Sequence, residues 1–362
     1  MKRHAVSVSK YVNVVVVHVC SEESIKNVQI ERFNNKGIIE VKIYYPKINS
    51  FVPLLSSIQK FFRIQKLYFS AIKSLSKEGI KFDLIHFNVI LPLGLIVYRL
   101  SKKLSVPYVI TEHWTGYLPE NIKKLSYFNL LTSRIIAKKA SMILPVSKNL
   151  KESMQTIGIN NKYNVVYNVV DTKMFGLKRK PTGILRFLHV STLKDEHKNI
   201  SGILRSVKRL NEKRQDFEML IVGDGDVTPH IKYAKELNVL NVLKIEGGKS
   251  INEIARIMHD SDVFVLFSNY ENLPCVISEA HCCGLPVIST DVGGIKEMID
   301  DSNGLLIKPK DEDSLYRSML YMLDNYINYN YLKIREDAIS KYSYEKIGRR
   351  FFEIYNDILN KQ

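Results

Sequence analysis

The sequence lacks an apolar run long enough to cross a membrane as a helix. The longest candidates, Val12–Val19 and Val89–Tyr98, fall short of the ~18 apolar residues that a spanning helix needs, and polar residues interrupt or flank both. The basic, then apolar start that ends at Cys20 is also similar to a signal sequence, but Asn13 breaks the run and no small-residue cleavage pattern precedes the cysteine. We therefore expect a protein that is not integral to a membrane.

Cysteine is sparse as well. The chain has four cysteines, and none has the spacing of a metal ligand. Cys282 and Cys283 are adjacent within an apolar segment, where buried thiols are common. No His/Cys cluster suited to a metal ion stands out elsewhere. We therefore expect no metal, no separate cofactor and a reducing, cytoplasmic location.

Acidic residues are the third shortage. Asp and Glu total 37 against 53 Lys and Arg, which gives a formal net charge of +16. Such an excess is typical of proteins that bind nucleic acid, an anionic membrane surface or a phosphorylated substrate. A nucleic-acid-binding protein is disfavoured, because no helix-turn-helix, zinc-finger or RNA-binding signature accompanies the charge. Charge alone does not choose between the other two partners.

What the sequence does contain is a repeated alternation of strand-like and helix-like segments. Apolar strand patterns spaced by helical ones indicate parallel sheets covered on both faces, so the fold class is α/β. A basic Gly/Pro segment near Leu177–Gly183 separates two such halves and suits a linker. We predict domains at 1–178 and 179–342, followed by a helical segment at 343–362. The expected strands are at 12–20, 41–46, 82–89, 107–111 and 141–147, and at 185–191, 217–223, 241–247, 262–268 and 286–290.

The most informative stretch is LFSNYENLPCVISEAHCCGLPVISTDVGGIKE at 266–297. It predicts a strand ending at Ser268, a turn, and a helix that begins at about Pro274. Glu271 and Glu279 stand eight residues apart across that turn. The exposed amides of a helix start suit a phosphate, and an acidic residue just inside the helix can hold ribose hydroxyls. Taken singly, each glutamate is as easily a solvated surface residue.

Together the two glutamates closely resemble the glutamate, seven residues, glutamate motif of glycosyltransferase family 4 and its retaining relatives. Gly284, Pro286 and the pair Gly293–Gly294 match the family's continuation of this segment. VVYNVVDTKMF at 165–175, MLIVGDG at 219–225 and SNGLLI at 302–307 are similar to further family segments in the same order. The resemblance implies a GT-B fold, in which two Rossmann-like domains face each other across a cleft.

The resemblance also assigns roles to residues. The catalytic candidates are Glu271 beside the transferred sugar, His113 in the loop TEHWTGY, and Lys198 beside the donor diphosphate. Ser191 and Thr192 stand where the family has glycine and arginine, so Lys194 is a candidate substitute for the arginine. A solvated loop is the alternative for both lysines, and His86 is interpreted as structural. The nucleotide-sugar-binding candidates are Glu279, Lys194, Thr192, Gly223, Gly225, Asn272, Leu273, Pro274 and Cys275.

By the same resemblance, the protein is a hexosyltransferase-type enzyme. It moves a sugar from a nucleotide diphosphate-sugar to a hydroxyl with retention of configuration, and the leaving phosphate helps to deprotonate the acceptor. The acceptor is a glycan or a polyprenyl-linked glycan, in cell-surface polysaccharide biosynthesis. The C-terminal helix is expected to cross back to the first domain.

Two departures remain. The family opens with a strand and a glycine-rich loop, whereas this sequence opens at a segment similar to the first helix. The alternative function is therefore a truncated or degenerate GT-B protein that binds nucleotide without turnover.

The segment 51–81 mixes Lys60, Arg63, Lys66 and Lys73 with aromatic residues, which predicts either a helix on the inner face of the plasma membrane or an ordinary covering helix.

Overall fold

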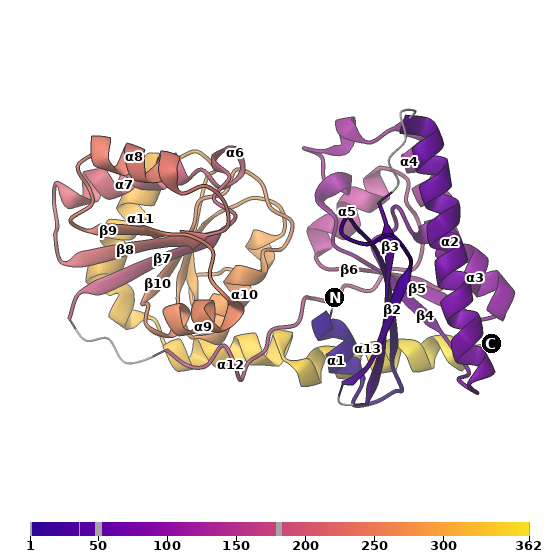
Figure 1. Ribbon diagram of the computed structural model, residues 1–362. Coiled ribbons are helices and arrows are strands. Elements are labelled where there is room, and N and C mark those ends of the chain that lie inside the picture. Colours follow the sequence, from indigo (N-terminus) through magenta and orange to yellow (C-terminus); the bar gives the residue numbers. More distant parts are fainter. Residues whose placement is uncertain (1, 36, 48–52, 179–182, 362) are drawn as a thin grey trace.

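The chain folds into two α/β halves, one on each side of Figure 1. The structure is a computed structural model that describes residues 2–35, 37–47, 53–178 and 183–361. The predicted linker near Leu177–Gly183 falls mostly on 179–182, outside the described residues. All ten expected strands are present, which confirms the predicted fold class.

The second half is built on one continuous sheet of six strands. Their order is β12-β11-β10-β7-β8-β9, and all the ladders are parallel. Every residue of β10 and β11 is buried, because helices cover both faces. The strands are β7 (Leu185–Ser191), β8 (Phe217–Gly223), β9 (Leu243–Glu246), β10 (Val263–Leu266), β11 (Val287–Thr290) and β12 (Gly304–Ile307). The helices are α6 (Asp195–Lys198), α7 (Ile200–Asn211), α8 (Thr228–Glu236), α9 (Ile251–His259), α10 (Cys275–Cys282) and α11 (Glu312–Asn325).

The first half has two separate three-stranded sheets, in the orders β1-β3-β2 and β4-β5-β6. Strand β2 is antiparallel to β3 and was not expected, since its residues are mostly polar and all exposed. Among the described residues, no ladder joins β1 to β4. The strands are β1 (Val15–Glu22), β2 (Gln29–Asn35), β3 (Ile38–Pro46), β4 (Ile85–Asn88), β5 (Tyr108–Glu112) and β6 (Met142–Pro145). The helices are α1 (Lys2–Val8), α2 (Pro53–Lys77), α3 (Gly94–Leu104), α4 (Tyr127–Lys139) and α5 (Lys148–Thr156).

Two helices late in the chain connect the halves. In Figure 1 α12 (Tyr331–Tyr342) lies under the second half, and α13 (Tyr344–Leu359) continues from it under the first. Arg335 of α12 donates to the backbone carbonyls of Phe175 and Thr172, at 2.8 and 3.0 Å, and so holds the chain that leaves the first half. The apolar stripe of α13 packs with α1 and with β5 and β6 in one core, whose members include Val8, Val109, Leu144, Ile347, Phe351, Ile354, Tyr355 and Ile358.

Candidate active site

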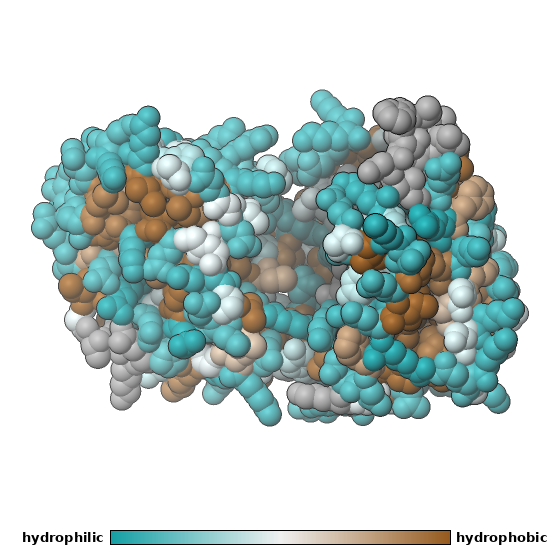
Figure 2. All heavy atoms as spheres, viewed as in Figure 1, coloured by the Kyte–Doolittle hydropathy of each residue, from teal (hydrophilic) through white to brown (hydrophobic). Residues whose placement is uncertain are grey.

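The candidate site lies where the carboxyl ends of strands from both halves face each other. Figure 2 shows the surface hollowed between the two halves at this level. Asn272, after β10, donates its side-chain N–H to the backbone carbonyl of His113, after β5, at 3.0 Å. The side-chain oxygen of Asn272 accepts a hydrogen bond from the Ser147 hydroxyl at 3.1 Å. These bonds bring the two halves into direct contact beside Glu271.

Glu271 is buried, with 7% of its surface exposed, and its carboxylate has charged and polar partners. Lys198, at the end of α6, donates its Nζ to Glu271 Oε1, and the Ser268 hydroxyl donates to the same oxygen at 2.8 Å. Lys198 is also buried, at 8% exposed. A buried carboxylate needs such a partner, because an unpaired charge away from water is strongly unfavourable. The sequence therefore places a paired anion and cation side by side in the cleft.

The position of this loop depends on glycine. Gly293 has a φ of +58°, and a β-carbon there would lie 2.0 Å from the backbone oxygen of Glu271. The next residue, Gly294, donates its backbone N–H to the backbone carbonyl of Asn272 at 2.7 Å. Only glycine allows the loop after β11 to approach the Glu271 backbone this closely. The glycine pair therefore supports the glutamate loop from behind.

The short helix α6 is fixed to the same loop. The His197 ring stacks on Tyr270, with centroids 4.1 Å apart, and its Nε2 lies 2.7 Å from the Tyr270 carbonyl oxygen. The Asn269 backbone N–H donates to the His197 carbonyl at 2.8 Å. Burial lowers the pKa of His197, and the nearby Lys198 lowers it further. The stacked ring and its hydrogen bond to Tyr270 therefore fix the short helix that carries Lys198.

Glu279 lies one turn into α10 and is 5% exposed. Its partner is Arg3 of α1, whose Nη1 donates to Glu279 Oε1 at 2.8 Å across 276 residues of sequence. Burial raises the pKa of Glu279, and the hydrogen bond and charge of Arg3 act in the opposite direction. The sequence analysis missed Arg3, because nothing local marks a residue whose partner is so distant in the chain.

The helix start differs slightly from its prediction. Pro274 is the N-cap, with extended backbone, and α10 begins at Cys275. The side chain of Leu273 is buried in the main core. The amides of Cys275 and Val276 belong to the first turn of the helix and have no partner within it. Any anion at this helix start would therefore meet these backbone groups.

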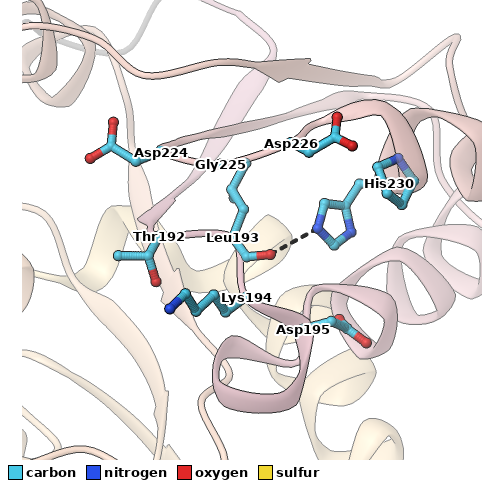
Figure 3. A pocket seen from close by; sticks show the side chains of 9 residues that line it. Thr192, Leu193, Lys194, Asp195, Asp224, Gly225, Asp226 and His230 are labelled. Atoms are coloured by element: carbon cyan, nitrogen blue, oxygen red, sulfur yellow. Dashed lines mark hydrogen bonds between the residues drawn. The ribbon is translucent and has the colours of Figure 1, made fainter. Parts of the chain in front are cut away.

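A pocket of about 600 Å³ opens beside this site, at the ends of β7 and β8. Figure 3 shows Thr192 and Lys194 on one side of it and Gly225 on the other. Gly223 is the last residue of β8, where a β-carbon would meet the Ser191 carbonyl oxygen at 1.8 Å. The pocket wall also carries three carboxylates, a feature that the sequence analysis missed; they belong to Asp195, Asp224 and Asp226.

Across the cleft, His113 follows β5 and is half-buried. Its Nε2 is buried and has no hydrogen-bond partner among the described residues. Burial lowers the pKa of its imidazole. Asn88 at the end of β4 and Asn269 after β10 also bury an unpartnered Oδ1. Three of the six such atoms among the described residues therefore lie just after or at the ends of strands, where a polar ligand can pair with them.

The neighbouring Glu112 is fully buried and supports the His113 loop. It accepts the backbone N–H groups of Ile90, His113 and Trp114 at 2.9, 3.0 and 2.9 Å. His86 has a structural environment, with Nε2 2.7 Å from the Thr111 hydroxyl.

The structure thus brings Glu271, Lys198, Asn272 and His113 together, with Glu279 on the helix that follows. Thr192, Lys194 and Gly225 line the adjacent pocket instead. Within the described ranges, no group of three or more His, Cys, Asp and Glu side chains is placed to hold a metal ion. No helix among those residues is long and apolar enough to cross a bilayer.

Comparison with known proteins agrees with this geometry. The family model Glycosyltransferase Family 4 matches residues 13–174, and Glycosyl transferases group 1 matches residues 170–345. An uncharacterized glycosyltransferase of Methanocaldococcus jannaschii is 27% identical over 78% of this chain and 77% of its own. The UDP-Gal:alpha-D-GlcNAc-diphosphoundecaprenol alpha-1,3-galactosyltransferase of Escherichia coli is 27% identical over 86% of this chain and 84% of its own.

Solved structures show the same fold. Sucrose-phosphate synthase of Thermosynechococcus elongatus has a TM-score of 0.78 at 18% identity, over 100% of this chain and 92% of its own. HepE of Anabaena in complex with UDP has a TM-score of 0.71 at 18% identity, over 87% of this chain and 86% of its own. These structures show the GT-B fold alone, whereas the two family models together span residues 13–345 and show that the chain belongs to the group 1, family 4-type glycosyltransferases and is a glycosyltransferase enzyme.

Proposed function

We propose that the protein is a retaining glycosyltransferase. It moves a sugar from a nucleotide diphosphate-sugar to a hydroxyl of a glycan or polyprenyl-linked acceptor in cell-surface polysaccharide biosynthesis. The observation that carries this proposal is the arrangement of Glu271 and Lys198 on one side of the cleft, with the unpartnered Nε2 of His113 on the other. This arrangement offers a cation, an anion and a neutral donor or acceptor to one bound molecule.

The charges of the site suggest where the diphosphate and the base of the donor would lie. The diphosphate would lie beside Lys198 and the open amides at the start of α10, where a cation and a helix N-terminus favour negative charge. The carboxylates of Asp195, Asp224 and Asp226 would repel phosphate from the pocket in Figure 3, so that pocket suits the neutral base. Glu279 would accept the ribose hydroxyls, and Arg3 must then turn from it or share it.

The transfer needs few protein groups. The acceptor oxygen forms a bond to the anomeric carbon as the bond from that carbon to the diphosphate oxygen breaks, and the acceptor proton passes to the leaving phosphate. Lys198 stabilises the charge that develops on that phosphate, an effect of about 3 kcal/mol in comparable sites. Glu271 and His113 would hold sugar hydroxyls and keep the anomeric carbon in line with the acceptor. Contact between the two halves excludes water from the donor.

The names of relatives support the acceptor class. The Escherichia coli relative is named for a diphosphoundecaprenol-linked acceptor, and a relative in Campylobacter jejuni is named in the same way. We propose a cytoplasmic enzyme that works at the membrane surface where such acceptors are anchored. The four cysteines are free, which suits a reducing compartment.

One observation favours a second candidate, a GT-B protein that binds nucleotide without turnover. The strands of the first half form two sheets with no ladder between β1 and β4 in the described residues, whereas the second half has one unbroken sheet. The separated β1 edge would leave the acceptor side less rigid than the nucleotide side. The two candidates differ in whether a bound donor is consumed.

The test is isothermal titration of UDP, GDP and their common sugar conjugates against the protein and against Glu279→Ala. The variant would lose two charge-assisted hydrogen bonds from the ribose hydroxyls to the Glu279 carboxylate, at about 1.5–3 kcal/mol each. We therefore expect Glu279→Ala to bind the nucleotide at least 100-fold more weakly. The matched control is Glu236→Ala on the exposed face of α8. Binding that survives in Glu279→Ala would remove the glutamate from the nucleotide site.

The conjugate that binds is then incubated with a lipid-linked acceptor, and the linkage is determined by NMR. Retention of the donor configuration supports the proposed reaction, whereas inversion overturns it. Tight binding with no product from any acceptor would favour the second candidate.

A further inference from the structure

Three consecutive helices form one outer layer of the first half. Residues of β5 alternate between two faces, so that Val109 packs against α13 while Ile110 packs in the core shared with α3 and α4. Helix α3 contacts both of its neighbours. Arg99 of α3 donates to Gln65 of α2 at 2.5 Å, and Gly94 of α3 lies against Ile136 of α4. Helices α2, α3 and α4 therefore share the face opposite α13.

This layer carries charge of one sign only. The sequences of α2, α3 and α4 contain eleven Lys and Arg residues and no Asp or Glu. Nearly all of these basic side chains are exposed, and the 3-10 helix Ile122–Lys124 before α4 adds two more lysines. Elsewhere the exposed Lys and Arg of this protein commonly have acidic partners, as on α11 and α12. A layer of basic helices with no acidic side chain of its own is complementary to an anionic surface.

The same layer exposes large apolar side chains. On α4, Tyr127 and Phe128 are 77% and 75% exposed, and Leu131 and Ile135 are 41% and 50% exposed. Tyr127, Leu131 and Ile135 are four residues apart, so they form one stripe along the helix. On α2, Phe62 is 57% exposed. Exposed apolar side chains on helices that carry only basic charge are typical of a surface that inserts into a membrane interface.

This arrangement bears on the two alternatives expected for segment 51–81. Leu67, Tyr68 and Phe69 of α2 are only partly exposed, and Leu67 packs against the core under β1 and β3. The covering-helix interpretation therefore holds for most of the apolar face of α2. The most exposed apolar residues lie on α4 instead, which the sequence analysis did not consider.

A groove on this layer has the chemistry of a lipid head-group site. It has a volume of about 490 Å³ and is lined by Phe62, Phe69, Lys66 and Lys73 of α2 and by Lys103 of α3. The Lys103 ammonium lies 5.0 Å from the centre of the Phe69 ring. The three lysines make the groove basic, and the two rings give it an apolar wall.

We propose that the outer face of α2, α3 and α4 docks on an anionic phospholipid bilayer, with lipid phosphate in the lysine groove and the α4 stripe at the interface. The inference rests on the proposed function in one respect, because a membrane-anchored acceptor gives such docking its purpose. Docking itself needs neither donor nor acceptor, so it can be tested separately from transfer. Exposed aliphatic side chains in the patch favour lipid over nucleic acid.

The experiment is flotation of the full chain with vesicles of phosphatidylcholine alone, or of phosphatidylcholine and phosphatidylglycerol in equal parts. We expect binding to the mixed vesicles only, and weaker binding at high salt. Replacing Lys66, Lys73 and Lys103 by Gln should weaken binding by about fivefold for each lysine, which corresponds to about 1 kcal/mol per charge. The matched control replaces Lys232 and Lys235, two exposed lysines of α8, and should bind normally.

A second pair of variants tests the apolar stripe. Tyr127→Ser with Phe128→Ser should reduce flotation, while Ile327→Ser with Leu332→Ser, which removes exposed apolar side chains from the second half, should not. Urea unfolding of each variant, followed by circular dichroism, reports whether it is folded. Absence from both vesicle types, equal binding to both, or full binding by the triple lysine variant would each overturn the proposal. Intact docking with no nucleotide binding would instead refute only the proposed function.

Discussion

The ion pair of Lys198 and Glu271 supports a prediction about both stability and turnover. The two side chains are 11% and 8% exposed, so the pair is held away from water. Removing one partner from a buried pair leaves the other charge uncompensated, which typically costs about 3–5 kcal/mol. Lys198→Met keeps the aliphatic stem, so the loss comes from the charge and not from a cavity. We expect its free energy of unfolding, measured with urea, to fall by about 3 kcal/mol.

The double variant Lys198→Met, Glu271→Gln distinguishes this cause from a general defect. With neither charge present, it should recover most of the lost stability, and the cycle should give a coupling energy of about 2 kcal/mol. Donor consumption should nevertheless stay at least 100-fold below that of the unmodified protein, because the cation beside the leaving phosphate is still missing. Lys208→Met, at an exposed site on α7, is the control. Unchanged stability in Lys198→Met, or normal donor consumption, would refute the argument.

Two further buried groups give predictions. Burial raises the pKa of Glu112 to about 7. The folded state therefore holds the Glu112 proton more tightly than the unfolded chain does. We expect about 3 kcal/mol of the free energy of unfolding to be lost as pH rises from about 4.5 to 7. Glu112→Gln should remove this dependence in urea unfolding at both pH values, and an identical pH profile would contradict the assignment. Lys178 pairs with Asp262 at 3.2 Å, and burial lowers its pKa. Lys178→Met should cost about 3–5 kcal/mol and Lys178→Met with Asp262→Asn much less, whereas equal losses would show that the pair is not coupled.

The sequence predicted those parts of the fold that local patterns determine. Most strands of the three sheets are apolar runs with turn signals at their ends, and the stripe of Ile347, Phe351 and Ile354 on α13 follows helical periodicity. Strand β2 was missed because its residues are exposed on both faces, so it has no alternation to detect. The α4 residues Tyr127 and Leu131 look like core positions in sequence, and only the packing shows that they face solvent.

The candidate site shows the same division. The motif predicted that Glu271 and Glu279 share one strand-turn-helix unit, and the structure describes that unit. The motif did not predict that Arg3 pairs with Glu279, or that the Asn272 side chain donates to the His113 carbonyl. Those contacts depend on how the two halves meet. Long-range pairs of this kind follow from tertiary packing and leave no local pattern.

The packing of α13 against the first half has a consequence for how the protein is made. The ribosome completes β6 roughly 200 residues before it begins α13, an interval of about 10–40 s at common elongation rates. Throughout that time the β-sheet face around Val109 and Leu144 has no Phe351 or Ile354 to cover it. The first half must therefore wait, partly folded and with apolar surface open to chaperones, until the second half has been synthesised.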